Sequence, residues 1–314
     1  MTEKILICGF GRMGISHTLQ TLGYFRSRGR LAEIYICDTS LISRAVAAFV
    51  CPSVCFITPK KLQTYDENHF EFAIDCTPPS FRSDLVPVLQ RIAKRCLVEK
   101  PVLVELDSSS MSGYVLQHNP LVAELKALVA DAKAISIDLL TNVDFTSAGW
   151  RSGKSGGLAN EYLGHCLSVP AIIYPQLAQA KLVSTSVDSN SVLVRLEAPK
   201  LRIDCKLRAD CEDVRKASYS WNFFSDSEAC ADSNCVEFDL YQITRSHGQS
   251  SEVLAGVAQR GVSVPFYLRG FDFANQNSRL IEGRGDVFGK ESLRAIERLV
   301  SEVAEIEYEN RFRG

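Results

Sequence analysis

The chain has 314 residues, of which 46% are hydrophobic, and a formal net charge of −2 at pH 7. A single hydrophobic core rarely grows to this length, so we expect two domains. Lysine and arginine are scattered along the chain, which argues against nucleic acid or an anionic membrane as a partner and leaves a small-molecule substrate.

The cellular location can also be predicted. No apolar run approaches the roughly 18 residues of a membrane-spanning helix, and the first expected strand begins within a few residues of Met1. We therefore expect a soluble, cytoplasmic protein. The eleven cysteines include no C-x-x-C pair, so we expect reduced thiols and no metal site.

An apolar run over residues 4–8 leads directly into glycines spaced G-x-G-x-x-G, at Gly9, Gly11 and Gly14. This pattern predicts a strand, a tight turn and the start of a helix, the arrangement that binds the pyrophosphate of a dinucleotide. Gly9 would permit the turn, Gly11 would let the backbone approach the phosphates, and Gly14 would let the helix pack on the strand. The predicted phosphate site comprises Gly9, Phe10, Gly11, Arg12, Met13 and Gly14.

A second strand, over residues 31–37, ends at Asp38, about two dozen residues after Gly14. An acidic residue roughly 20 residues beyond the glycines binds the ribose of NAD in this fold and would repel the 2′-phosphate of NADP. We therefore expect NAD, with NADP possible because Arg44 follows closely. The alternative is that Asp38 only opens a turn with the residues after it.

Strand and helix patterns alternate over the rest of residues 1–117, which predicts a Rossmann domain with a doubly wound parallel sheet. The expected helices cover residues 14–28, 41–50 and 83–94, and the later strands cover 70–76 and 96–98. Ligands of such sheets lie outside the carboxyl ends of the strands. The residues expected at those ends are Thr77, Pro78, Glu99 and Lys100.

Lys100 precedes a proline and is therefore held out of the helical conformation. We expect its ammonium group to project toward the same crevice, where it could polarise a substrate oxygen. The alternative is an exposed lysine in a turn, which is the commoner environment for this residue.

The second domain is predicted over residues 118–314, and Asn119 followed by proline predicts its first helix. A strand over 134–141 and a polar loop over 142–153 follow. A Gly-Gly pair at 156–157 then opens a helix that we expect Pro170 to end.

Glu161 and His165 are four residues apart on that helix and so share one face. A carboxylate this close would raise the pKa of the imidazole and orient it, which suits a general acid/base. The alternative is an ordinary surface pair.

Polar and apolar residues alternate over 201–209 and 218–223, and residues 191–197 and 235–244 are expected to form further strands of the same sheet. Such alternation predicts an open, mainly antiparallel sheet that is covered on one side. The aromatic residues at 219, 221 and 223 are interpreted as core, and the last helix has an apolar stripe from Leu293 to Ile306. The uncovered face predicts a homo-oligomer, a dimer or a tetramer.

Four motifs occur in one order along the chain: the glycine loop, Thr77-Pro78-Pro79-Ser80, Glu99-Lys100-Pro101, and Gly156-Gly157 with Glu161 and His165. Together they resemble the glucose-fructose oxidoreductase and inositol dehydrogenase family, and Arg269-Gly270-Phe271 resembles a later family pattern. The resemblance implies a Rossmann domain, then an α/β domain whose open sheet often contributes to oligomer contacts.

The same resemblance implies NAD(P)-dependent hydride transfer, commonly on sugars, polyols or their derivatives. It implies that Lys100 and His165 are the catalytic pair, with Glu161 at a position where most members have aspartate. Alternatives are a reductase of a C=N or C=C bond in another metabolite, or a non-catalytic NAD(P)-binding regulatory protein.

The sequence departs from the family pattern at three places. The interval after the strand at 96–98 leaves little room for a helix that is usual in the family. Arg82 stands where histidine is common, and Gly164 lies one position later than the usual glycine. We therefore expect a more open substrate pocket.

Overall fold

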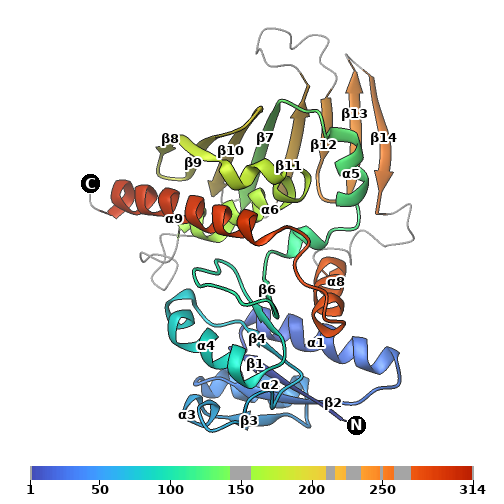
Figure 1. Ribbon diagram of the computed structural model, residues 1–314, viewed down its shortest axis with the longest axis vertical. Coiled ribbons are helices and arrows are strands. Elements are labelled where there is room, and N and C mark those ends of the chain that lie inside the picture. Colours follow the sequence, from blue (N-terminus) through green and yellow to red (C-terminus); the bar gives the residue numbers. More distant parts are fainter. Residues whose placement is uncertain are drawn as a thin grey trace. The chain divides into compact units, whose positions relative to one another are not determined.

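The computed structural model describes residues 2–141, 157–209, 216–223, 235–247, 250–257 and 270–312, with only the backbone of 270, 271 and 312 (Figure 1). The chain forms two compact units, which are Met1–His118 with Arg269–Asp286, and Asn119–Leu268 with Val287–Gly314. The predicted domain limits, 1–117 and 118–314, did not include this return of the chain to the first unit.

The first unit contains a six-stranded parallel sheet in the order β3-β2-β1-β4-β5-β6. Its strands are β1 (Glu3–Cys8), β2 (Ala32–Cys37), β3 (Cys55–Ile57), β4 (Phe72–Asp75), β5 (Cys96–Val98) and β6 (Ser110–Ser112). Its helices are α1 (Arg12–Ser27), α2 (Leu41–Val50), α3 (Pro59–Leu62), α4 (Arg82–Ile92) and α8 (Gly270–Ile281), with short 3-10 turns at Pro79–Phe81 and Val115–His118.

Apolar side chains pack on both faces of this parallel sheet. Phe25 of α1 and Leu280 of α8 belong to the core on one face, and Leu62 of α3 and Leu89 of α4 belong to the core on the other. Strands buried on both sides require continuous apolar runs, which explains the pattern at residues 4–8. The predicted doubly wound parallel sheet is confirmed.

The connection between β5 and β6 has an unusual form for a parallel pair. Residues 99–109, all of them within the described part of the chain, contain no helix. The expectation that a helix is missing after the strand at 96–98 is confirmed.

The second unit contains an eight-stranded sheet in the order β14-β13-β12-β11-β7-β10-β9-β8, in which only β7 and β10 pair in parallel. Its strands are β7 (Ala134–Thr141), β8 (Lys181–Val187), β9 (Ser191–Ala198), β10 (Leu201–Ala209), β11 (Lys216–Asn222), β12 (Cys235–Phe238), β13 (Gln242–His247) and β14 (Ser250–Gly256). The helices α5 (Val122–Val129), α6 (Gly164–Ile173) and α9 (Lys290–Phe312) lie along one side of this sheet, with a π-helical turn at Ala159–Leu163 and a 3-10 turn at Pro175–Gln179 (Figure 1).

Alternation along the strands explains why this sheet is covered on one face. In β10, Ile203 and Leu207 are fully buried, whereas Arg202 and Lys206 are exposed. The rings of Tyr219 and Trp221 are stacked with their centroids 5.7 Å apart, and both are fully buried. The predicted open, mainly antiparallel sheet is confirmed, as is the assignment of these two aromatic residues to the core.

Three local predictions were wrong. Helix α5 begins at Val122, two residues later than expected, although the Asn119 side chain accepts a hydrogen bond from the Leu121 amide and caps the turn before the helix. Pro170 lies inside α6, a fully embedded helix in which buried apolar surface offsets one missing backbone hydrogen bond. The expected strand over 235–244 is two strands, since the Asp239 carboxylate accepts two amide hydrogen bonds and turns the chain.

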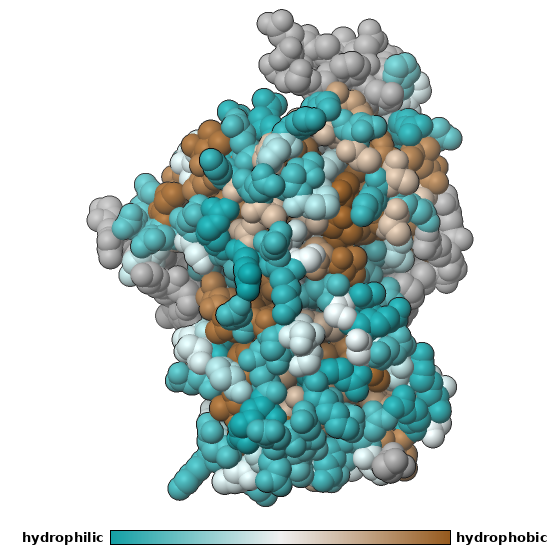
Figure 2. All heavy atoms as spheres, in the orientation of Figure 1, coloured by the Kyte–Doolittle hydropathy of each residue, from teal (hydrophilic) through white to brown (hydrophobic). Residues whose placement is uncertain are grey.

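Most of the visible surface is hydrophilic, with apolar residues in separate patches (Figure 2). Among the helices of the described residues, none is both long enough and apolar enough to cross a bilayer.

Candidate active site

The glycine-rich turn follows β1, and each glycine meets a different requirement. Gly9 has a φ of +83°, and a Cβ there would lie 2.8 Å from the Cys76 carbonyl oxygen. A Cβ on Gly14 would lie 2.2 Å from the Gly9 carbonyl oxygen, so only glycine allows α1 to pack this closely. A Cβ on Gly11 would meet nothing within 4 Å. This open space is where an anion could approach the backbone at the start of α1.

The start of α1 also offers backbone amide groups to an anion. Gly11 is the N-cap residue, and no side chain among the described residues caps the helix there. Arg12, the first residue of the helix, is exposed. The first amides of a helix lack partners within it, and the positive end of the helix dipole lies at the same place. These groups together can hold a pyrophosphate.

Asp38 lies directly beside this loop. One carboxylate oxygen accepts a hydrogen bond of 2.7 Å from the Phe10 amide, and the other accepts one of 2.7 Å from the Ser40 amide. The carboxylate therefore does open a turn, as the alternative interpretation proposed, and it also contacts the glycine loop. The Arg44 guanidinium lies 5.1 Å from the centre of the Phe56 ring, over its face.

A cavity of about 370 Å³ adjoins the glycine loop and Asp38. Its polar lining comes from the ends of β1, β2 and β4 together with Gln63 after α3 and Asp84 of α4, and its apolar lining comes mainly from α3 and α4. The lining residues include Gly9, Asp38, Thr39, Leu62, Thr77, Pro78, Phe81, Leu85 and Val88. A mainly apolar cavity with a few convergent polar groups is typical of a small-molecule site and suits a nucleoside.

The Glu99 side chain is buried at the end of β5, within a polar cluster of the first unit. Its Oε1 lies 3.0 Å from Nε2 of His17, and its Oε2 accepts a hydrogen bond of 3.3 Å from the Lys100 amide. The other ring nitrogen of His17 lies 3.0 Å from Oδ1 of Asn277 in α8. A Cβ on Gly113, the residue after β6, would lie 2.5 Å from the Glu99 Cα, so the chain packs tightly on Glu99 there. Sequence analysis missed His17 and Asn277, whose spacing along the chain carries no local signal.

In the first unit, the structure therefore brings the predicted cofactor residues together at one edge of the parallel sheet. The glycine loop, Asp38, Thr77 and Lys100 follow the carboxyl ends of β1, β2, β4 and β5, respectively. The chain leaves β1 for β2 on one side, while β4 pairs with β1 on the other, so this edge contains a topological switch point. Ligands of doubly wound sheets bind at such points.

Glu161 and His165 belong to the second unit and are both buried. Glu161 lies in the π-helical turn and His165 in the first turn of α6, so the two do not share one regular α-helix. Their action together with Lys100 stays a prediction. The predicted polar loop over 142–153, the residue Gly156, and Arg269 lie outside the described residues.

A carboxylate that sequence analysis missed fixes the helix carrying Glu161 and His165. The buried Glu307 of α9 accepts hydrogen bonds of 2.9 Å from the Leu158 amide and 2.8 Å from the Ala159 amide. Gly157 has a φ of +93°, and a Cβ there would lie 2.8 Å from a Glu307 oxygen. Gly157 therefore makes room for this helix cap.

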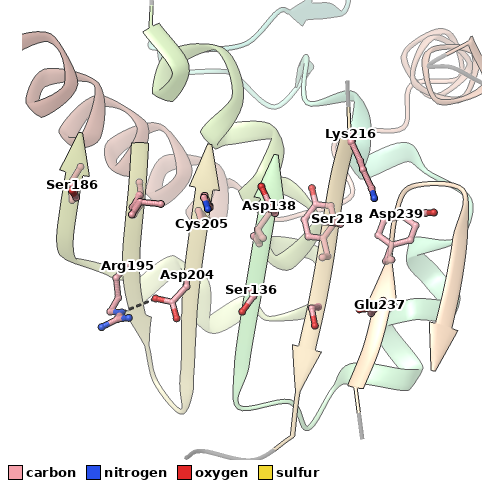
Figure 3. A pocket seen from close by; sticks show the side chains of 18 of the residues that line it. Ser136, Asp138, Ser186, Arg195, Asp204, Cys205, Lys216, Ser218, Glu237 and Asp239 are labelled. Atoms are coloured by element: carbon pink, nitrogen blue, oxygen red, sulfur yellow. Dashed lines mark hydrogen bonds and ion pairs between the residues drawn. The ribbon is translucent and has the colours of Figure 1, made fainter. Parts of the chain in front are cut away.

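A larger hollow lies on the open face of the second sheet (Figure 3). It has a volume of about 850 Å³, and polar side chains such as Ser136, Asp138 and Ser218 line it. Arg195 and Asp204 form an ion pair of 2.7 Å there, in which both side chains are at least one-third exposed. We place the candidate site at the smaller cavity, because only that one adjoins the glycine loop and Asp38.

No protein-family profile matches the sequence, and no functionally curated protein is similar to it in sequence. Solved structures show the same fold. A levoglucosan dehydrogenase in complex with NADH and L-sorbose is 11% identical, with a TM-score of 0.76 and 98% of each chain covered. An oxidoreductase from Agrobacterium radiobacter in complex with NAD+, L-tartaric acid and magnesium is 12% identical, with a TM-score of 0.70 and 98% and 97% covered. An oxidoreductase domain protein from Kribbella flavida is 14% identical, with a TM-score of 0.70 and 99% and 98% covered.

Proposed function

We propose that this protein is an NAD-dependent oxidoreductase that transfers a hydride between nicotinamide and a small polar substrate, a sugar, a polyol or a sugar derivative. The observation that carries the proposal is the carboxyl edge of the parallel sheet. There, the open space at Gly11, the uncapped start of α1 and the Asp38 carboxylate lie beside a cavity of nucleoside size. These groups fit a dinucleotide, and Asp38 favours NAD over NADP.

The fold supports the proposal further. Structures with this fold include a levoglucosan dehydrogenase in complex with NADH and levoglucosan, and an oxidoreductase in complex with NAD+. The motifs that resemble the glucose-fructose oxidoreductase and inositol dehydrogenase family agree with this reading. We therefore propose membership of that family.

The proposed mechanism assigns a role to three residues. The bound cofactor would supply the hydride donor or acceptor. Lys100, half-buried at the end of β5, would polarise the substrate oxygen with its ammonium group. His165 would remove the proton from the substrate hydroxyl during oxidation and return it during reduction. Glu161 would orient the imidazole, and Glu307 would fix the helix that carries both residues.

Titration of the purified protein with NADH, followed by its fluorescence, tests cofactor binding. A panel of sugars and polyols with NAD, followed by absorbance of the reduced nicotinamide, then tests turnover. The proposal predicts saturable NADH binding and reduction of NAD by at least one member of the panel. Binding with no turnover of any alcohol, ketone or imine would instead favour the non-catalytic binding protein.

A further inference from the structure

Arg82, the first residue of α4, is a buried cation that the proposed mechanism does not use. Its exposed fraction is only 2%, and arginine is rarely buried to this extent unless its charge is paired. The partner is Asp75, the fully buried last residue of β4, whose Oδ2 accepts a hydrogen bond of 3.0 Å from Arg82 Nε.

The rest of the guanidinium group binds two backbone carbonyls, one in each loop at the carboxyl edge. Nη2 donates a hydrogen bond of 2.9 Å to the Thr77 carbonyl, in the turn after β4. Nη1 donates to the carbonyl of Pro101, the residue that follows Lys100. One side chain thus joins the turn expected to hold the cofactor to the segment that carries Lys100.

Asp75, the partner of Arg82, also binds the Thr77 turn directly. Its Oδ1 accepts hydrogen bonds of 2.9 Å from the Thr77 amide and 2.6 Å from the Thr77 hydroxyl. The Thr77 turn is therefore bound by both members of the buried ion pair. Lysine could replace the charge of Arg82 but not its planar fork, which directs hydrogen bonds to three acceptors at once.

We propose that Arg82 is a positioning residue, which holds Lys100 at a fixed place relative to the Thr77–Pro78 turn. This inference rests on the proposed function. A purely structural ion pair would need only Asp75, whereas two of the three partners of Arg82 are backbone carbonyls in the loops that carry the cofactor site and Lys100.

Arg82→Lys tests the inference, because it keeps the charge and removes the fork. Arg95→Lys is the matched control. Arg95 donates to the backbone carbonyls of Leu280 and Ile281, but it precedes β5 and so lies at the amino end of the same strand. Each variant is compared with the wild type in its NADH dissociation constant, its melting temperature, and the rate at which Lys100 reacts with an amine-specific reagent, measured by mass spectrometry.

We expect Arg82→Lys to weaken NADH binding by about ten-fold, the size of effect expected for a lost hydrogen bond from a charged group. We also expect it to change the labelling rate of Lys100 severalfold. Arg95→Lys should change neither quantity, even where its melting temperature falls as much. Wild-type NADH affinity and wild-type Lys100 labelling in Arg82→Lys would overturn the inference.

The inference can still be tested if Arg82→Lys does not fold or if the wild type does not bind NADH. If Arg82→Lys does not fold, the double variant Asp75→Asn with Arg82→Gln removes both buried charges and keeps an acceptor for Thr77, and the same changes are expected in it. If the wild type does not bind NADH, the proposed function fails. The labelling of Lys100 still decides whether Arg82 fixes that residue.

Discussion

The carboxyl edge of the parallel sheet and the open face of the antiparallel sheet are both polar, but they are built differently. At the edge, Asp75 and Glu99 are buried, and each lies against a buried side chain from another segment, Arg82 for Asp75 and His17 for Glu99. On the open face, Arg195 is exposed and Asp204 is half-buried, and Asp204 forms ion pairs with both Arg195 and Arg202 (Figure 3). The larger hollow lies on the open face, yet the smaller cavity has the directed polar groups. A catalytic site depends more on hydrogen-bonding groups held in fixed positions than on the volume of its cavity.

The largest effects are expected at the catalytic residues. His165→Ala should lower the turnover number by about 100- to 10,000-fold, the usual loss when a general acid/base is removed. Lys100→Met should be at least as damaging, because it removes the charge that stabilises the reacting oxygen. Steady-state kinetics on a substrate found in the panel would measure both losses. Near wild-type turnover in both variants would contradict the assignment.

The half-buried carboxylate of Asp286, in the first unit, predicts a pH effect that the open face should lack. Burial raises the pKa of Asp286 to about 6, against hydrogen bonds from the Ser112 amide and hydroxyl and the Gln117 amide. The folded state therefore holds a proton that the unfolded state releases at lower pH. The contribution of Asp286 to the free energy of unfolding is therefore highest below about pH 4. It falls by roughly 3 kcal/mol as the pH rises to about 6.

Asp286→Asn should remove that decline, as measured by urea unfolding at a series of pH values. Asp204→Asn on the open face is the control and should keep the pH dependence of the wild type. If Asp286→Asn also retained the full decline, the raised pKa of Asp286 would not be its cause.

A smaller effect is expected on cofactor choice. Asp38→Ser removes the carboxylate that would bind the ribose hydroxyl groups and repel a 2′-phosphate. The affinity for NADH should therefore fall by about ten-fold, and the preference for NADH over NADPH should become smaller. Titrations with both cofactors would measure this. Equal or tighter binding of NADPH by the wild type would contradict the role of Asp38.

The smallest effect on stability is expected on the open face. Exposed ion pairs contribute little, so Arg195→Ala should leave the melting temperature almost unchanged. The homo-oligomer predicted through this face should dissociate more readily in the same variant. Light scattering would show this, and a strict monomer of 34.8 kDa for the wild type at micromolar concentration would contradict the predicted oligomer.

Sequence patterns predicted those features that short segments determine by themselves. The limits of α2, β5 and β7 follow from local apolar patterns, and the turn at Gly9 follows from a conformation that glycine favours. The partners of buried charges could not be predicted. Glu307 caps a helix that begins about 150 residues earlier, and Arg82 binds segments on either side of it in the chain. Such pairs depend on the packing of distant segments, and a single sequence carries no local pattern for them.

The central claim is that a dinucleotide pyrophosphate binds at the open space beside Gly11. A Cβ at this position would meet nothing within 4 Å, and the backbone φ of −77° suits any residue. Gly11→Val should therefore fold with the melting temperature of the wild type, while its valine side chain occupies the phosphate position. The most direct test is an NADH titration of Gly11→Val beside the wild type. The account predicts saturable binding by the wild type and a loss of at least about 100-fold in the variant. Equal NADH affinity in the two proteins would contradict it.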